Sequence, residues 1–223
     1  MRNIDFNKKH LSPHRRNMIE LFVNCTRKIK NEEGEKAITI KRISECTELN
    51  SATIYNYFEN VEHLVFFANM DALDSFNADL NNYVTEGDDP IKVYIEVWKC
   101  FAKHAFNKPE EYHYIFFSEF AKEKPYYIYQ YYKIFPVENN GFPAYLMKML
   151  TTDNFIERLD KQIAVSINVG YFTDYTAEKV NDMARYIFEG LLEDIRKEEI
   201  SKEEALEKFE EYLNIIVDTL KKK

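Results

Sequence analysis

The sequence contains few glycines, prolines and cysteines, and the shortage of each excludes a class of protein. Only 5 glycines occur in 223 residues, and they lie too far apart for a phosphate-binding loop or for the tight turn that presents a nucleophilic serine. The 6 prolines form no low-complexity linker with them, and the sequence has no internal repeat. A nucleotide-binding or serine-hydrolase enzyme is therefore not indicated.

Cysteine is equally scarce. Cys25, Cys46 and Cys100 are too few and too scattered for a disulfide framework or a Cys-x-x-Cys metal site, so we expect three buried free thiols. No apolar run approaches the roughly 20 residues of a membrane-spanning helix. The basic N-terminus "MRNIDFNKKHLSPHRR" is not followed by the apolar stretch of a secretory signal. These absences predict a cytoplasmic protein with no membrane partner.

Positive charge is scarce overall but unevenly distributed. The formal net charge is −8, yet residues 1–70 contain 11 Lys or Arg against 9 Asp or Glu, whereas the remaining 153 residues contain 19 against 29. An acidic body with a mildly basic N-terminal end is typical of a protein that offers only that end to a polyanion.

Helical periodicity runs through most of the chain, and we expect an all-α fold. Strand signals are nearly absent, and the single hairpin candidate, "NNG" at 139–141, lies between helical patterns. The expected helices cover about 13–30, 40–47, a short segment from 50 or 51, 60–83, 90–107, 109–121, 125–135, 143–150 and 153–169, followed by two long amphipathic helices near the C-terminus. Thr39, Asn50 or Ser51, and Asn60 are the expected N-caps.

The segment "LNSATIYNYFENVEHL" at 49–64 carries an unusual helix face. At about 100° per residue, Ile54 and Phe58 fall on one side and can face a core. The opposite side is short, uncharged and able to form hydrogen bonds; it comprises Ala52, Thr53 and Asn56, with Tyr55 and Tyr57 on its flanks. Because solvated helix faces usually carry Lys and Glu, we expect this face to contact a partner.

Two short helices joined by a tight turn, after a longer supporting helix, make a helix-turn-helix. The second helix of such a pair enters the major groove of DNA, where outward side chains must be short and able to bind base edges. Ser51, Ala52, Thr53 and Asn56 meet both demands, because Asn can pair in two places with adenine and Ala or Thr methyl groups can contact thymine. The hydroxyls of the flanking tyrosines can reach phosphates.

The sequence "TIKRISECTELNSATIYNYFENVEHL" at 39–64 strongly resembles the DNA-binding signature of the tetracycline-repressor (TetR) family of bacterial transcription regulators, whose "T-x-Y-x-[YH]-F" core occurs here as "TIYNYF". The matching residues are Thr39, Ile43, Leu49, Asn50, Thr53, Tyr55, Tyr57, Phe58 and Leu64. Glu48 departs from the glycine usual in the turn, and Val61 replaces a basic residue common at the start of the fourth helix. The segment between the first two helices is also longer and more charged than usual.

The resemblance implies a helix-turn-helix domain over residues 1–65 and a helical ligand-binding and dimerisation domain over 66–223. It implies a homodimer on a near-palindromic double-stranded DNA operator, with recognition helices about 34–36 Å apart. The recognition segment lacks Lys and Arg, so the N-terminal arm, Lys41 and Arg42 must supply most of the phosphate affinity; His10, His14 and His63 could also touch phosphate. The predicted DNA-binding residues are Thr39, Lys41, Arg42, Asn50, Ser51, Ala52, Thr53, Tyr55, Asn56, Tyr57, Asn60 and His63.

The resemblance also implies an apolar small-molecule pocket between helices of the larger domain. The predicted ligand-binding residues are Trp98, Phe101, Tyr112, Phe116, Phe120, Tyr127, Tyr131 and Tyr171. For any one of these rings, a place in the core or at a dimer surface is the simpler interpretation. The nearby carboxylates of Glu96, Glu111 and Glu119 could complement a cationic ligand.

We expect the last two helices to pair with their copies as a four-helix bundle. Gly190 in the middle of a helix costs about 1 kcal/mol relative to Ala, and close approach of a neighbouring helix would explain it. The predicted function is a transcriptional repressor released from DNA by a small apolar or aromatic effector, with the long fourth helix as the lever between the domains. An activator, a ligand-independent regulator, and a protein-interaction module with the same fold are the alternatives.

An enzyme is the competing class. A di-iron bundle needs two Glu-x-x-His pairs, and only Glu110 and His113 form one. His104 and His113 could share a metal ion, although packed or exposed histidines are the simpler interpretation. We therefore expect no catalytic residue, no metal and no cofactor.

Overall fold

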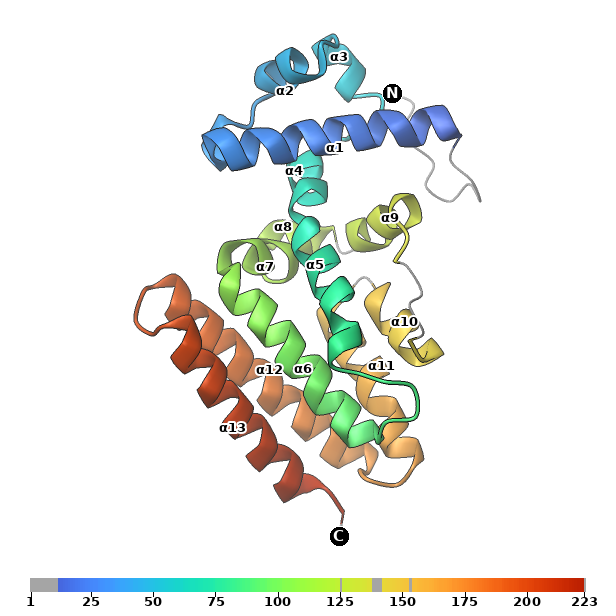
Figure 1. The fold of residues 1–223 in the computed structure, drawn as a ribbon, viewed down its shortest axis with the longest axis vertical. Helices are drawn as coiled ribbons and strands as arrows, with labels where there is room; N and C mark the ends of the chain where they lie inside the picture. The colour runs from blue at the N-terminus through green and yellow to red at the C-terminus, as the bar shows by residue number, and fades with distance from the viewer. Residues whose placement is uncertain (1–11, 125, 138–141, 153, 223) are drawn as a thin grey trace. The chain divides into compact units, whose positions relative to one another are not determined.

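The computed structural model describes residues 12–124, 126–137, 142–152 and 154–222, and these residues form helices, turns and loops with no strand. The expected all-α fold is confirmed. The chain forms two compact units (Figure 1): Met1–Asp71 with Tyr126–Pro136, and Ala72–Pro125 with Val137–Lys223. None of the helices in the described ranges is long and apolar enough to cross a membrane.

The N-terminal unit is built on a long first helix, α1 (Pro13–Glu33). Ser12 caps it by accepting a hydrogen bond from the Arg15 backbone N–H, and proline at the first turn costs no hydrogen bond. Gly34 ends it with φ 87°, a left-handed conformation that glycine adopts without strain. The other elements of this unit are η1 (Glu35–Ala37), α2 (Ile40–Thr47), α3 (Ser51–Ile54), α4 (Val61–Asn69) and α9 (Tyr127–Ile134).

The helix expected over 60–83 is interrupted. The structure divides it into α4 (Val61–Asn69), α5 (Asp71–Asp79) and the 3₁₀ turn η2 (Leu80–Asn82). The break at Met70 lies between Asn69 and Asp71, and short polar side chains are poor helix formers because they compete for backbone hydrogen bonds. The Asn69 side chain also accepts a hydrogen bond from Lys30 Nζ at 2.6 Å. The prediction of one continuous helix is therefore wrong.

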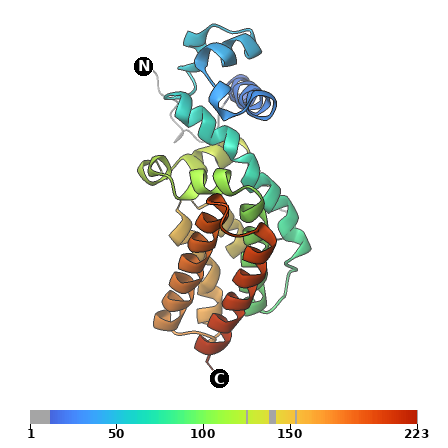
Figure 2. The same cartoon turned by 90° about the vertical axis from the view of Figure 1, so that its left-hand side faces the viewer.

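The C-terminal unit contains α5, η2 and seven further helices among its described residues. These are α6 (Pro90–Asn107), α7 (Pro109–Phe116), α8 (Glu119–Glu123), α10 (Ala144–Leu150), α11 (Phe155–Asn168), α12 (Asp174–Arg196) and α13 (Lys202–Leu220). The helix expected over 109–121 is two helices, since Ser118 starts a new one by capping α8. Figure 2 shows the two long closing helices, α12 and α13, side by side.

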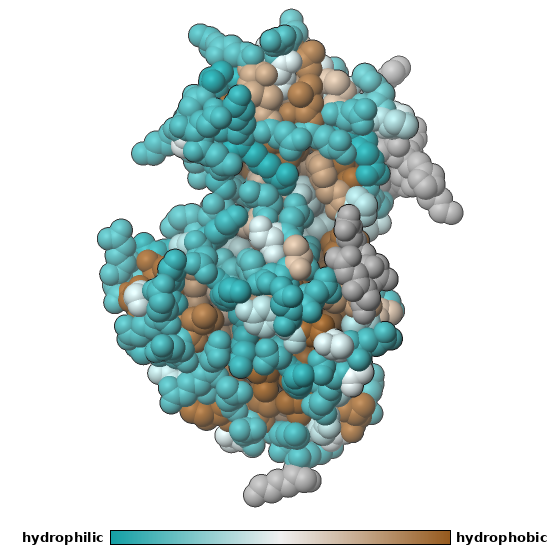
Figure 3. Space-filling model, viewed as in Figure 1, coloured by the Kyte–Doolittle hydropathy of each residue, from teal (hydrophilic) through white to brown (hydrophobic). Residues whose placement is uncertain are grey.

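Aromatic rings fill the core of the C-terminal unit. Phe188 of α12 is 0% exposed and lies at the centre of the cluster. Its ring is within 6.2 Å, centroid to centroid, of the rings of Trp98, Phe101, Phe106, Phe117, Phe155 and Phe209. On the face shown in Figure 3, hydrophilic side chains cover most of both units. Most of the aromatic content of this unit is therefore core.

Two of the three cysteines are paired. A disulfide joins Cys25 of α1 to Cys46 of α2, with Cα atoms 6.0 Å apart, whereas Cys100 is free and buried. The expectation of a buried free thiol is confirmed for Cys100 and wrong for the other two. The packing of α2 against α1 brings together residues that lie 21 positions apart in the sequence, and their spacing alone does not reveal this.

Candidate functional site

The helix-turn-helix is assembled from capped short helices. Thr39 Oγ1 accepts a hydrogen bond from the Arg42 N–H at 3.1 Å and starts α2. Asn50 Oδ1 accepts one from the Ala52 N–H at 2.8 Å and starts α3. The inward side chains of the pair, Ile43 and Ile54, are at most 1% exposed. These contacts fix the direction in which the rest of α3 points.

The turn between the helices has a left-handed residue. Glu48 has φ 58° and ψ 24°, the conformation that a glycine would adopt at no cost. A non-glycine residue pays about 1–2 kcal/mol there. The departure from glycine at this position therefore carries a local strain.

The outward surface of α3 and the turn after it is polar and uncharged. Ser51, Ala52 and Asn56 are exposed, and Tyr55 is 46% exposed. Thr53 is half-buried. Because α3 is a single turn, the residues after Ile54 continue it as hydrogen-bonded turns, with the Asn56 N–H donating to the Thr53 carbonyl at 3.1 Å. The result is a compact, hydrogen-bonding surface free of charged side chains.

Tyr57 and Arg15 support one edge of this surface. The Tyr57 ring is half-buried and packs on Phe22 with ring centroids 5.8 Å apart. The Arg15 guanidinium lies 5.7 Å from the Tyr57 ring centroid and donates to the Asn56 backbone carbonyl at 3.2 Å. Arg15 thus brings a positive charge beside Asn56, and the basic run at the N-terminus is the sequence signal that points to it.

The two cations at the start of α2 differ in availability. The Lys41 side chain is 88% exposed, and its nearest ion-pair partner, Glu45, is 4.0 Å away. Arg42 instead donates to both carboxylate oxygens of Glu33, with its Nη2 2.7 Å from Oε1. These hydrogen bonds lower the pKa of Glu33 and raise the pKa of Arg42. Of the two, Lys41 is therefore the side chain less engaged in ion pairs.

His63 and Asn60 have structural roles at the start of α4. Asn60 is exposed and caps the helix by accepting from the His63 N–H at 2.8 Å. His63 is 1% exposed, and its ring stacks on Tyr127 of α9 at 3.9 Å. Because burial keeps His63 away from any nucleic acid, we leave it out of the interface proposed below. Residue His10 and the rest of the arm up to position 11 lie outside the described residues.

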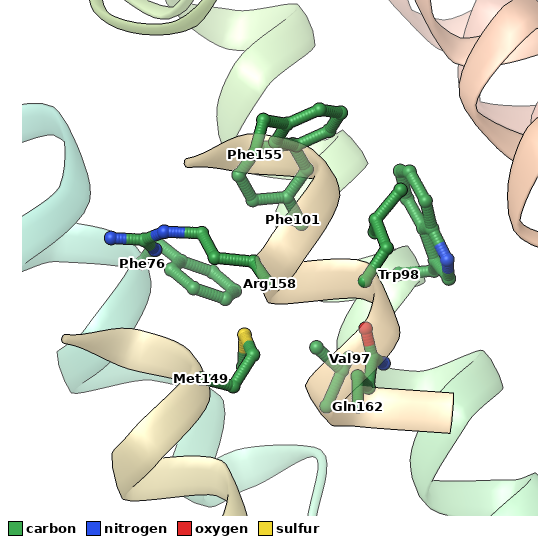
Figure 4. A pocket seen from close by; sticks show the side chains of 9 residues that line it. Phe76, Val97, Trp98, Phe101, Met149, Phe155, Arg158 and Gln162 are labelled. Atoms are coloured by element: carbon green, nitrogen blue, oxygen red, sulfur yellow. The ribbon is translucent and has the colours of Figure 1, made fainter. Parts of the chain in front are cut away.

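A small cavity lies in the C-terminal unit (Figure 4). It is lined by Phe76, Val97, Trp98, Phe101, Met149, Phe155, Arg158, Leu159 and Gln162. Arg158 and Gln162 project from α11 among the rings. The Arg158 guanidinium donates to the carbonyls of Leu150 and Thr152, both at 2.8 Å, and Gln162 donates to that of Tyr94 at 3.0 Å. The lining is apolar apart from these two polar groups.

The residues predicted to bind a ligand do not form one group. Trp98 and Phe101 line the cavity. Tyr112 and Phe116 are buried and pack against Phe101 at 5.2 and 5.7 Å, centroid to centroid. The remaining four are elsewhere: Phe120 stacks on Tyr114, Tyr171 binds Asp89 at 2.5 Å, and Tyr127 and Tyr131 belong to the N-terminal unit.

Sequence reasoning missed most of the cavity lining. Phe76, Met149, Arg158 and Gln162 were not expected there. A signal existed in "FIERLDKQI" at 155–163, where Arg158 and Gln162 fall next to the apolar stripe of α11 at a spacing of four. Polar residues in such positions are buried only when they are hydrogen-bonded.

Comparison with known proteins finds solved structures with a similar fold. Neither a protein-family model nor a curated protein matches the sequence. Among solved structures, RolR without ligand has a TM-score of 0.52 and 16% identity, with 89% of this chain and 96% of that chain covered. A protein from Shewanella sp. PV-4, described as a tetR family transcription regulator, has a TM-score of 0.50 and 8% identity, with 92% and 98% covered.

The two matches cover about nine-tenths of this chain. At 8% and 16% identity, the structural similarity indicates a shared arrangement of helices. The chain therefore has the fold of the TetR-family transcription regulators.

Proposed function

We propose that this protein is a TetR-family transcription regulator that binds a double-stranded DNA operator as a homodimer. In this proposal it acts as a repressor and leaves the operator when a small apolar or aromatic effector binds. The observation that carries the proposal is the short, uncharged outward surface made by Ser51, Ala52, Thr53, Tyr55 and Asn56.

The chemistry of that surface suits the major groove. A recognition segment must approach base edges closely, and short side chains allow this. The Asn56 amide can donate to and accept from adenine, while the methyl groups of Ala52 and Thr53 can contact thymine. Charged side chains would instead favour phosphates and carry no sequence information. The composition of the surface therefore favours base recognition over general attraction to DNA.

The phosphate contacts in this proposal come from the surroundings. Lys41 is almost fully exposed at the start of α2, and Arg15 lies beside Asn56. Thr39, Asn50 and Asn60 cap the three helices around the surface, and the N–H groups at helix starts attract phosphate. Among the residues that the structure describes, few cations lie near this surface, so we expect the dependence of affinity on salt to be modest.

The dimer in this proposal forms through α12 and α13. On α12, Met183 and Tyr186 are 46% and 63% exposed, and on α13, Tyr212 and Ile215 are 39% and 55% exposed. Gly190 continues the α12 stripe at a spacing of four, and a Cβ atom there would meet no atom within 4 Å. An exposed apolar stripe that ends in an open glycine suits close packing against the same helices of a second copy.

The effector in this proposal occupies the cavity around Trp98 and Phe101. Pockets for small ligands are mostly apolar with few polar groups, and Arg158 and Gln162 supply such groups here. A ligand can weaken DNA binding only by the ratio of its affinities for the two conformations of the protein.

The proposal is tested by fluorescence anisotropy with DNA that flanks the protein's own gene, because regulators of this kind often control neighbouring genes. We expect at least about 10³-fold tighter binding to one flanking duplex than to a scrambled duplex at the same salt. We also expect two chains per duplex in sedimentation experiments. Equal affinity for the two duplexes would contradict the proposal.

The dimer surface has its own matched pair of variants. Tyr186→Asp should shift the protein from dimer to monomer and abolish operator binding, because a charge would be buried in the apolar interface. Tyr129→Asp alters a 44% exposed tyrosine of α9 and should leave the dimer unchanged. A Tyr186→Asp protein that remains dimeric would show that α12 is not the interface.

A further inference from the structure

Three different metal-ligating side chains meet in the C-terminal unit. Asp79 is the last residue of α5, and Cys100 and His104 lie one helical turn apart on α6. One ligand atom from each of the three lies within 4.8 Å of the other two. Asp79 Oδ2 and His104 Nε2 are 3.0 Å apart. The arrangement lies outside the DNA-binding surface and outside the lining of the cavity.

We propose that Asp79, Cys100 and His104 form a site for a divalent transition metal, and that Zn²⁺ is the ion it takes. Thiolate, imidazole and carboxylate are the ligands that Zn²⁺ uses, at about 2.0–2.3 Å. The sulfur ligand excludes Mg²⁺ and Ca²⁺, which take oxygen ligands. Tetrahedral ligand atoms at these distances from the metal are about 3.3–3.8 Å apart. Because the three ligand atoms already lie within 4.8 Å of one another, small side-chain rotations would bring them to this geometry.

The surroundings hold two of the ligands in position. Asn82 Nδ2 donates to Asp79 Oδ1 at 2.9 Å, which leaves Oδ2 facing His104. Such outer hydrogen bonds orient metal ligands and are part of most metal sites. The His104 ring packs edge-on against Phe76 with centroids 6.3 Å apart.

Two of the three ligand side chains reach solvent. Cys100 is 0% exposed, whereas the side chains of Asp79 and His104 are 23% and 20% exposed. An ion can therefore enter beside the carboxylate and imidazole, and water can fill the fourth position. Coordination converts the Cys100 thiol to a thiolate and releases its proton.

The Lys103 ammonium group lies beside the Asp79 carboxylate, where the metal ion would bind. Its Nζ lies 3.0 Å from the same Asp79 Oδ2 that faces His104. Its side chain is 45% exposed, and its Nζ lies over the Tyr83 ring, 5.5 Å from the ring centroid, so it can swing into solvent when a metal binds. Lys103 therefore competes with the metal, and its removal should strengthen metal binding.

The test is a titration of the chelator-treated full-length protein with Co²⁺, followed by displacement with Zn²⁺. A cysteine ligand gives a thiolate-to-cobalt charge-transfer band in the near ultraviolet, and a tetrahedral site gives strong visible bands. We expect both, and we expect Zn²⁺ to remove them. The absence of a charge-transfer band would overturn the proposal.

Variants assign the ligands. Cys100→Ser should remove the charge-transfer band, while the Cys25→Ser/Cys46→Ser double variant should keep it. His104→Gln, at a position where the side chain is 20% exposed, should weaken Co²⁺ binding at least about tenfold, and His113→Gln should not. Lys103→Gln should bind Co²⁺ more tightly than wild type. A band that survives in both Cys100→Ser and His104→Gln would place the metal elsewhere and overturn the assignment.

Discussion

The α3 surface of the N-terminal unit and the aromatic core of the C-terminal unit use their polar side chains in opposite ways. In the N-terminal unit, Tyr55 and Asn56 lie exposed on a short surface after α3. In the C-terminal unit, Tyr94 and Tyr112 are 0% exposed, and their hydroxyls donate within the chain, to Asn181 Oδ1 at 3.0 Å and to the Ala72 carbonyl at 3.1 Å. A tyrosine on the α3 surface therefore has a different role from a tyrosine in the C-terminal core.

This difference shows which residues can be assigned a function from their surroundings. A polar group that is buried and already hydrogen-bonded is accounted for by folding alone. Folding alone does not account for an exposed, uncharged cluster in which helix caps fix the direction of the side chains. Changes in the C-terminal core should therefore alter stability, and changes on the α3 surface should alter binding.

Phe188→Ala should break the C-terminal core and have the largest effect. Removal of a fully buried phenylalanine costs about 3–5 kcal/mol of the free energy of unfolding, and here six neighbouring rings lose a partner. Urea denaturation measures it. The control, Ile156→Ala, alters a 53% exposed residue of α11 and should change stability by at most about 0.5 kcal/mol. Equal losses in the two variants would contradict the assignment of Phe188 to the core.

Reduction of the Cys25–Cys46 disulfide should destabilise the N-terminal unit selectively. A cross-link that closes a loop of this length stabilises by about 3 kcal/mol in the chain-entropy account. Hydrogen exchange with mass spectrometry, with and without reductant, should show faster exchange in α1 and α2 and no change in α12. The Cys25→Ser/Cys46→Ser variant should not respond to reductant. Identical exchange in oxidised and reduced wild type would show that the pair is not bonded in solution.

Glu48→Gly should stabilise the protein by up to about 1 kcal/mol, because glycine adopts the left-handed turn without steric cost. Glu45→Gly is the matched control, since it places glycine inside α2 and should destabilise by about 1 kcal/mol. Thermal unfolding of both variants measures the difference. If Glu48→Gly lost as much stability as Glu45→Gly, the left-handed conformation at 48 would be wrong.

Lys41→Ala should have the smallest effect, which is confined to the electrostatic part of DNA binding. The slope of log K against log salt should fall in magnitude by about 1. Arg42→Ala should change it less, because Glu33 holds the Arg42 guanidinium, and Lys28→Ala on the exposed side of α1 should not change it. A slope that does not differ between wild type and Lys41→Ala would remove Lys41 from the phosphate contacts.

Local signals made much of the fold predictable. The caps Thr39 and Asn60 are the expected ones, and Asn50 is the cap of the two candidates Asn50 and Ser51. Helices α2 and α6 occupy the expected ranges 40–47 and 90–107. Capping and apolar periodicity act over a few residues, so they can be recognised in the sequence alone. The division of the chain at 65 and 66, the dimer and the effector stay predictions.

Features that depend on packing between distant segments could not be predicted. The Cys25–Cys46 bond, the burial of His63 against Tyr127, and the place of Tyr131 in the N-terminal unit all follow from contacts between separate helices. Cys100 and His104 lie four residues apart in the sequence, but Asp79 comes close to them only through the packing of the fold.

The most direct test of the central claim is the affinity of Asn56→Ala for the operator, measured beside Asn24→Ala, which alters an exposed asparagine of α1. If Asn56 lies in the major groove, its variant should lose about 1–3 kcal/mol of binding free energy on the operator. Binding to scrambled DNA and the behaviour of Asn24→Ala should match the wild type. An Asn56→Ala protein that binds the operator as tightly as wild type would contradict the claim.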